Sequence, residues 1–106
     1  MNDLIRPALY QAHHRIVPVT SSTAPVVEWW VAGPVCESSD DFGEHPLPDP
    51  PPSLLAIREA GAYGRSMAST YNTRPIASEV FVSGGKVATV RRARTISALV
   101  EEEVRE

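Results

Sequence analysis

The chain has 106 residues, enough for one domain with a single hydrophobic core. Its formal net charge of -3 argues against general attraction to nucleic-acid phosphates, because that attraction requires a basic face. The one cysteine cannot form an internal disulfide, and no apolar run approaches membrane-spanning length. We therefore expect a cytoplasmic protein that binds neither nucleic acid nor membrane.

The first predicted element is a short helix over residues 4–12, because proline is tolerated in a first helical turn and Ala, Leu and Gln favour helix. Arg6 and Tyr10 are four residues apart, so they share one face of this helix. A guanidinium and a phenol side by side can hold a carboxylate through charge-assisted hydrogen bonds. The spacing alone equally allows a tyrosine packed on the core beside an exposed arginine.

Two strands are predicted next. Residues 15–19 form a short one, whose proline indicates an edge or a strand end, and the β-branched and aromatic run 26–31 forms another, which a Gly-Pro pair ends. Cys36 and Glu37 follow at the exit of the second strand, where side chains are positioned but not paired. Position alone nevertheless favours Cys36 as a small buried hydrophobe, since most free cysteines are buried.

A long connection without regular structure is predicted over residues 38–53, because five prolines there oppose helix and strand. A loop of this length in a compact domain is usually functional or lies over a partner. Residues 54–58 then predict a strand, and residues 61–64 a turn in which two glycines leave little bulk around the phenol of Tyr63.

The end of the chain predicts a β-hairpin and a helix. Strands over residues 76–82 and 86–91 are joined by Ser83-Gly84-Gly85, a hairpin turn sequence. Thr95 is a predicted N-cap for an amphipathic helix, whose apolar stripe is Ile96, Leu99, Val100 and Val104. The predicted fold is mainly β, a small antiparallel barrel or sandwich with short helices at both ends.

Charged residues near the end of the chain indicate a solvated surface of mixed charge. Arg91, Arg92 and Arg94 are followed closely by Glu101, Glu102, Glu103 and Glu106. No metal site is predicted, because the adjacent His13 and His14 would point to opposite faces of a strand and no Cys/His ligand spacing is present.

Several motifs, in this order and spacing, resemble diaminopimelate decarboxylase, a family of fold-type III pyridoxal-phosphate enzymes. They are Asn2-Asp3-Leu4-Ile5-Arg6-Pro7-Ala8-Leu9-Tyr10, Gly33-Pro34-Val35-Cys36-Glu37-Ser38, Gly61-Ala62-Tyr63-Gly64 with Met67-Ala68-Ser69-Thr70-Tyr71-Asn72-Thr73-Arg74-Pro75, and Val90-Arg91-Arg92. That family has an N-terminal α/β barrel and a C-terminal β domain of the alanine racemase and group IV decarboxylase type. The resemblance implies that residues 1–106 form the C-terminal β domain, without the barrel, its Schiff-base lysine or its glycine-rich phosphate site.

The resemblance also implies roles for five residues. Arg6 and Tyr10 match positions that bind a substrate carboxylate, and Tyr63 matches a tyrosine near substrate and cofactor, often at the cofactor phosphate. Cys36 matches a thiol that reaches into the partner subunit's active site and donates a proton after decarboxylation. Glu37 matches the residue that pairs with the distal ammonium group of the substrate, and it favours the diaminopimelate branch because relatives acting on ornithine or arginine typically have aspartate there.

The implied activity is the conversion of meso-diaminopimelate to lysine and carbon dioxide, with pyridoxal 5′-phosphate as cofactor, in a homodimer with shared active sites. The chain alone is expected to be inactive. One alternative is the equivalent domain of a related basic amino-acid decarboxylase, and another is a free-standing β module for binding or assembly. A third, a cysteine hydrolase using Cys36 with His13 or His14, lacks a strand-turn-helix nucleophile motif.

Overall fold

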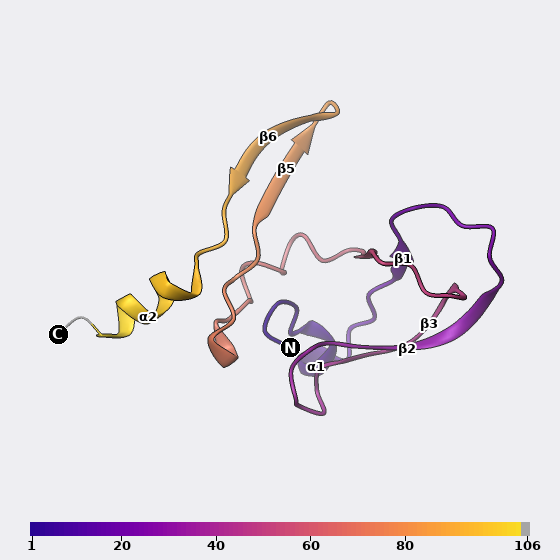
Figure 1. The fold of residues 1–106 in the computed structure, drawn as a ribbon, viewed down its shortest axis with the longest axis horizontal. Helices are drawn as coiled ribbons and strands as arrows, with labels where there is room; N and C mark the ends of the chain where they lie inside the picture. Colours follow the sequence, from indigo (N-terminus) through magenta and orange to yellow (C-terminus); the bar gives the residue numbers. More distant parts are fainter. Residues whose placement is uncertain (105–106) are drawn as a thin grey trace.

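The computed structural model describes residues 1–104, which form a mainly β fold with a short helix near each end (Figure 1). The elements are α1 (Arg6–Tyr10), β1 (Ile16–Pro18), β2 (Val26–Ala32), β3 (Asp41–Pro48), β4 (Leu55–Ile57), the 3-10 helix η1 (Tyr71–Thr73), β5 (Glu79–Ser83), β6 (Lys86–Arg91) and α2 (Ile96–Val104). The strands form three antiparallel pairs, β1 with β4, β2 with β3, and β5 with β6. The predicted mainly β, antiparallel class is confirmed.

The longest pair, β2 with β3, contains the main departure from the sequence analysis. β2 confirms the strand predicted over residues 26–31, but β3 occupies Asp41–Pro48, within the predicted irregular connection. Pro46 and Pro48 are two residues apart, so their nitrogens lie on the same edge of β3. Within residues 1–104, β3 is paired with β2 along one edge and with no strand along its other edge, and proline is tolerated at such an unpaired edge.

The shorter elements follow local sequence signals. β1 and β4 confirm the strands predicted around residues 15–19 and 54–58. Gly84 and Gly85 both have positive φ, 56° and 73°, which suits the two-residue turn of the β5–β6 hairpin, although β5 begins at Glu79 and not at residue 76. Thr95 caps α2 as predicted, because its hydroxyl accepts the Ala98 N–H at 3.1 Å.

The mixed-charge surface predicted near the end of the chain is also present. Arg94 pairs with Glu102 and Arg91 with Glu79, and all of these contacts lie at the surface. Glu106 lies outside the described residues. Within residues 1–104, no helix has the length and apolar character needed to cross a membrane.

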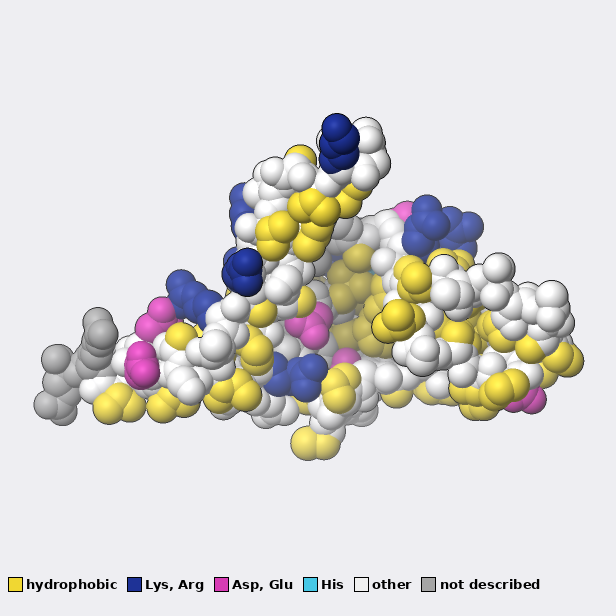
Figure 2. All heavy atoms as spheres, turned by 45° about the horizontal axis from the view of Figure 1, so that its top comes forward, with side chains coloured by type: hydrophobic (Ala, Val, Ile, Leu, Met, Phe, Trp, Pro, Cys, Tyr) yellow, Lys and Arg dark blue, Asp and Glu magenta, His cyan; other side chains and the backbone are white. Residues whose placement is uncertain are grey.

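The buried core is small and lies around the N-terminal segment. Its apolar members are Met1, Leu4, Ile16, Val35 and Leu47. The radius of gyration is 16.0 Å, larger than the roughly 13 Å typical of a compact domain of this length. The β5–β6 hairpin and α2 project away from this core (Figure 1), and apolar side chains are visible along the hairpin (Figure 2). Such uncovered apolar surface is typical of a region that packs against other protein.

Candidate active-site elements

The loop between β2 and β3 holds Cys36 and Glu37 at the protein surface. Its two ends are joined because the Gly33 N–H donates to the Asp40 carbonyl at 2.8 Å. The Asp40 N–H donates to the Glu37 carbonyl at 3.2 Å, and the buried Asp40 carboxylate accepts the Val35 N–H at 2.8 Å. The loop is therefore fixed from the inside by one aspartate.

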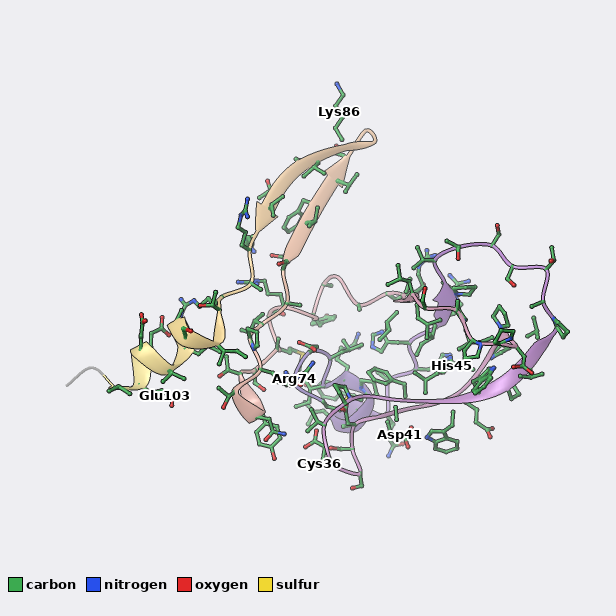
Figure 3. The ribbon with its side chains drawn as sticks, viewed as in Figure 1. Cys36, Asp41, His45, Arg74, Lys86 and Glu103 are labelled. Atoms are coloured by element: carbon green, nitrogen blue, oxygen red, sulfur yellow. The ribbon has the colours of Figure 1, made fainter. Side chains whose placement is uncertain are left out.

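Cys36 is exposed on this loop, beside α1 (Figure 3). The burial favoured by position alone is wrong, because the neighbouring Val35 takes the buried position and turns the thiol outwards. The histidines are engaged elsewhere. The Nδ1 of His14 lies 3.0 Å from the Arg58 carbonyl oxygen, and the ring of His13 stacks on that of His45. Neither arrangement provides Cys36 with a base, so the hydrolase alternative gains no support.

Glu37 is partly buried, and its carboxylate accepts a hydrogen bond from the α-ammonium group of Met1. Asp40 Oδ1 lies 3.4 Å from the same nitrogen. Burial disfavours the charge on this ammonium group, but the hydrogen bond to Glu37 and the negative charge of Asp40 outweigh it, so the Met1 pKa is raised above its ordinary value of 8.0. The Glu37 carboxylate is thus paired with a positive charge in this structure.

A second cluster forms where α1 meets the turn that carries Tyr63. The guanidinium carbon of Arg6 lies 4.5 Å from the centre of the Tyr63 ring, within the range of a cation–π interaction. Arg6, Tyr10, Tyr63 and Met67 line one open hollow of about 290 Å³. The predicted same-face placement of Arg6 and Tyr10 is confirmed. One cation and two phenols around a hollow suit a carboxylate or phosphate ligand.

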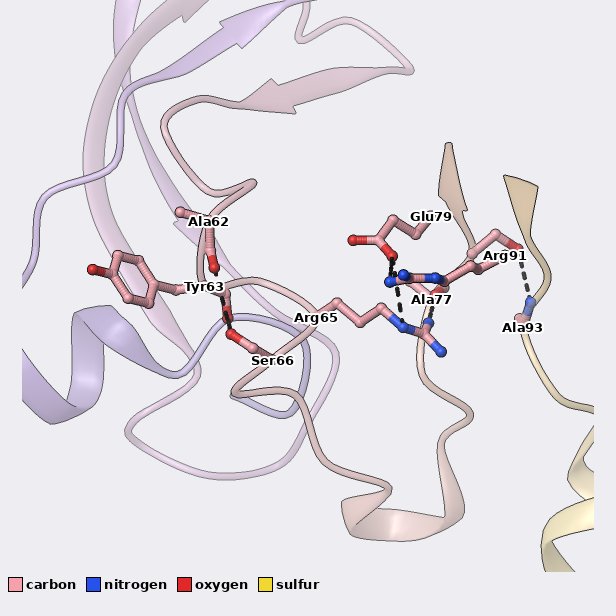
Figure 4. Close-up of polar contacts among 9 residues, drawn as sticks. Ala62, Tyr63, Arg65, Ser66, Ala77, Glu79, Arg91 and Ala93 are labelled. Atoms are coloured by element: carbon pink, nitrogen blue, oxygen red, sulfur yellow. Dashed lines mark hydrogen bonds and ion pairs between the residues drawn. The ribbon is translucent and has the colours of Figure 1, made fainter. Parts of the chain in front are cut away.

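The turn that carries Tyr63 is tied to the β5–β6 hairpin (Figure 4). Within the turn, the Gly64 N–H donates to the Ala60 carbonyl at 2.7 Å. Arg65 then reaches out of the turn, donating to the Ala77 carbonyl at 3.2 Å and lying 3.8 Å from Glu79. The position of the Tyr63 phenol therefore depends on residues far along the chain.

The five predicted site residues do not form one cluster. Glu37 lines a different hollow of about 340 Å³, to which Ile5 and Ala8 also contribute. Arg6 and Tyr10 line the other hollow, so the N-terminal helical segment presents its alternate faces to the two hollows. One ligand could contact the Arg6 cation and the two phenols, and a different ligand could contact the loop that carries Cys36 and Glu37.

Asp40, which fixes the loop that holds Cys36 and Glu37, is a residue that sequence reasoning missed. It lies in a stretch predicted to be irregular, and nothing local indicates that its side chain turns inwards. The sequence offered one signal, a glycine at the end of β2. A Cβ atom at Gly33 would overlap the Asp40 carboxylate, so glycine there leaves the space that this carboxylate fills.

Comparison with known families identifies the domain. The family model described as "Pyridoxal-dependent decarboxylase, C-terminal sheet domain" matches residues 1–61, more than half of the chain. The chain belongs to this family. The sheet domain so identified agrees with the mainly β fold and with the resemblance found in the sequence, and members of this family use pyridoxal phosphate.

Curated relatives and solved structures extend the similarity to nearly the whole chain. Diaminopimelate decarboxylase of Zymomonas mobilis is 45% identical over 105 residues, which cover 97% of this chain and 25% of the relative. That of Vibrio cholerae is 47% identical over 100 residues, covering 93% and 24%. The crystal structure of diaminopimelate decarboxylase from Helicobacter pylori complexed with L-lysine aligns with a TM-score of 0.83 and 44% identity, covering 97% of this chain and 26% of that one. The chain thus spans about a quarter of the length of these relatives.

The residues of the sheet domain fit part of a pyridoxal phosphate site. The phenol of Tyr63, which lies beside the positive charge of Arg6, suits an anionic group such as the cofactor phosphate. The chain has one lysine, Lys86, at the tip of the β5–β6 hairpin (Figure 3), and it does not line the hollow that Arg6 and Tyr63 share. A lysine that binds the cofactor covalently would therefore come from outside these 106 residues. In the described part of the chain, no group of three or more His, Cys, Asp or Glu side chains is placed to hold a metal ion.

Proposed function

We propose that this sheet domain is part of a diaminopimelate decarboxylase, which converts meso-diaminopimelate to L-lysine and carbon dioxide. The observation that carries the proposal is the meeting of Arg6, Tyr10 and Tyr63 in one hollow, because it brings together three residues from two separate motifs. The similarity to curated diaminopimelate decarboxylases over more than nine-tenths of the chain supports the substrate class.

Pyridoxal phosphate would supply an electron sink for the carbon from which carbon dioxide is lost. The residues of this chain bind and orient the substrate around that change. Arg6 and Tyr10 hold a substrate carboxylate by charge-assisted hydrogen bonds, and Tyr63 contacts the cofactor phosphate. Glu37 pairs with the distal ammonium group of the substrate. A substrate without that group would leave the carboxylate of Glu37 unpaired.

Cys36 holds the proton that replaces the lost carboxyl group. A thiol suits this task because its pKa lies near the working pH and neighbouring groups can tune it. Its exposed position on the β2–β3 loop leaves it free to reach a group that belongs to another subunit. A thiol that must stay reduced also favours the cytoplasm.

We further propose that the complete enzyme is a homodimer in which each sheet domain serves two active sites. The placement of Glu37 and Arg6 in different hollows supports this arrangement. One site would receive Arg6, Tyr10 and Tyr63, and the site of the partner subunit would receive Cys36 and Glu37. The sheet domain alone would be inactive, because the cofactor lysine lies outside it.

A chimaera tests the proposed activity. The C-terminal quarter of the Zymomonas mobilis diaminopimelate decarboxylase is replaced by this chain, and lysine and carbon dioxide formation are measured with diaminopimelate, ornithine and arginine. We expect decarboxylation of diaminopimelate. Cys36→Ala should lower kcat by at least about 100-fold, the lower end of the range for one proton-transfer group. Ser38→Ala, a change at an exposed neighbour on the same loop, should not.

The proposal fails if a dimeric chimaera that binds pyridoxal phosphate prefers ornithine or arginine, or if its activity survives Cys36→Ala. The isolated chain supplies a further check. It should release no carbon dioxide from diaminopimelate, and activity in a sample free of other chains would contradict the assignment of the cofactor lysine to another part of the enzyme.

A further inference from the structure

We propose that Asp40 is a positioning residue that holds Cys36 and Glu37 in their working geometry. The proposal rests on the proposed roles of these two residues, and it assigns to Asp40 no contact with substrate or cofactor. Its action would pass through the backbone of the β2–β3 loop, by the hydrogen bond to Val35 and the packing against Gly33.

The contacts of Asp40 reach both sides of Cys36. Its carboxylate accepts the N–H of Val35, the residue before the cysteine, at 2.8 Å. Its own N–H donates to the carbonyl of Glu37, the residue after the cysteine, at 3.2 Å. The Asp40 side chain is 5% exposed, so its carboxylate is shielded from water that would compete for the Val35 N–H. Both peptide neighbours of Cys36 are therefore fixed by one residue.

Gly33 supplies an independent observation. A Cβ atom there would overlap the Asp40 carboxylate, including the oxygen that accepts the Val35 N–H. The φ of Gly33 lies outside the left-handed region, so alanine is compatible with the backbone and this overlap is its main cost. Gly33→Ala would push the carboxylate away from Val35. Gly33→Ala should thus have the same effect on the loop as Asp40→Ala, although Asp40 itself is unchanged.

The expected consequence is a defect in both binding and proton transfer. A misplacement of about 1 Å in a reacting group can cost about 100-fold in rate. Movement of the loop would shift Glu37 away from the substrate ammonium group and Cys36 away from the carbon that it protonates. A variant that only destabilised the fold would lower the active fraction and the apparent kcat, but it would leave KM unchanged.

The test uses the chimaeric decarboxylase with Asp40→Ala, Asp40→Asn, Gly33→Ala and the double variant Gly33→Ala/Asp40→Ala. We expect Asp40→Ala to raise KM for diaminopimelate at least about fivefold and to lower kcat at least about tenfold. Asp40→Asn should recover most of both, because asparagine keeps the size and one acceptor for Val35. Gly33→Ala should resemble Asp40→Ala, and the double variant should be no worse, because removing the carboxylate frees the space above Gly33.

Hydrogen exchange of the Val35 amide in the 106-residue chain tests the contact independently of catalysis. It should be at least about tenfold faster in Asp40→Ala than in the unchanged chain, and nearly unchanged in Asp40→Asn. The proposal is overturned if this exchange does not respond, if KM stays unchanged in Asp40→Ala, or if adding Gly33→Ala to Asp40→Ala causes the same further loss of activity that Gly33→Ala causes in the unchanged chimaera. Faster exchange in an otherwise inactive chimaera would support the loop contact and contradict the proposed function.

Discussion

Replacing Arg6 by lysine tests whether the hollow shared by Arg6, Tyr10 and Tyr63 holds the substrate carboxylate. Lysine keeps the positive charge, but it loses the planar guanidinium that forms two parallel hydrogen bonds and stacks on Tyr63 at 4.5 Å. One charge-assisted hydrogen bond contributes about 1.5–3 kcal/mol, and a cation–π contact with an exposed ring about 0.5–1 kcal/mol. Since about 1.4 kcal/mol is tenfold in affinity, loss of the hydrogen bond alone predicts an increase in KM of at least about tenfold.

Steady-state kinetics of the chimaeric decarboxylase with diaminopimelate measure this effect. Arg15→Lys is the matched control, because Arg15 lies at the surface, where it pairs with the exposed Glu59 at 3.4 Å. Its KM should stay within about twofold of the unchanged chimaera, as expected for an exposed ion pair. If Arg6→Lys behaves like Arg15→Lys while the cofactor remains bound, the hollow does not hold the substrate carboxylate and the reasoning from its geometry is wrong.

Two further predictions concern the fold. Leu47→Ala should lower the free energy of unfolding, measured by urea titration, by about 2–5 kcal/mol, because Leu47 is 1% exposed in a small core. Val82 is 64% exposed, so the control variant Val82→Ala should lower it by less than about 1 kcal/mol. Equal losses in the two variants would contradict the assigned core. When Met1 has a free amino group, the pKa of that group is higher in the folded chain than in the unfolded chain, because it pairs with Glu37 and Asp40. This pairing therefore stabilises the fold fully below about pH 8, the unfolded-state pKa. The stabilisation is lost as pH rises through the folded-state pKa. Unfolding free energies measured from about pH 7 to about pH 10 should therefore fall, and the fall should be smaller after acetylation of the amino group; identical pH profiles would refute the pairing.

The sequence determined those features that depend on a few neighbouring residues. The β-branched and aromatic run of β2, the two glycines of the β5–β6 turn and the Thr95 cap were all predicted from local rules and are present. Arg6 and Tyr10 were placed on one face because helical geometry fixes residues four apart. The motifs also indicate the family, because they depend on residue identity and spacing alone.

The tertiary structure decided features that depend on residues far apart in the chain. β3 was predicted as irregular because proline rules describe a single segment, whereas pairing with β2 makes the proline-containing stretch an edge strand. Tyr63 meets Arg6 only after the turn packs on α1, and Cys36 turns outwards only because Val35 takes the buried position. The inward carboxylate of Asp40 and the space above Gly33 exist only together, because each depends on the closed β2–β3 loop. Local propensity is set within a few residues, but side-chain direction and burial are set by the long-range contacts that close the fold.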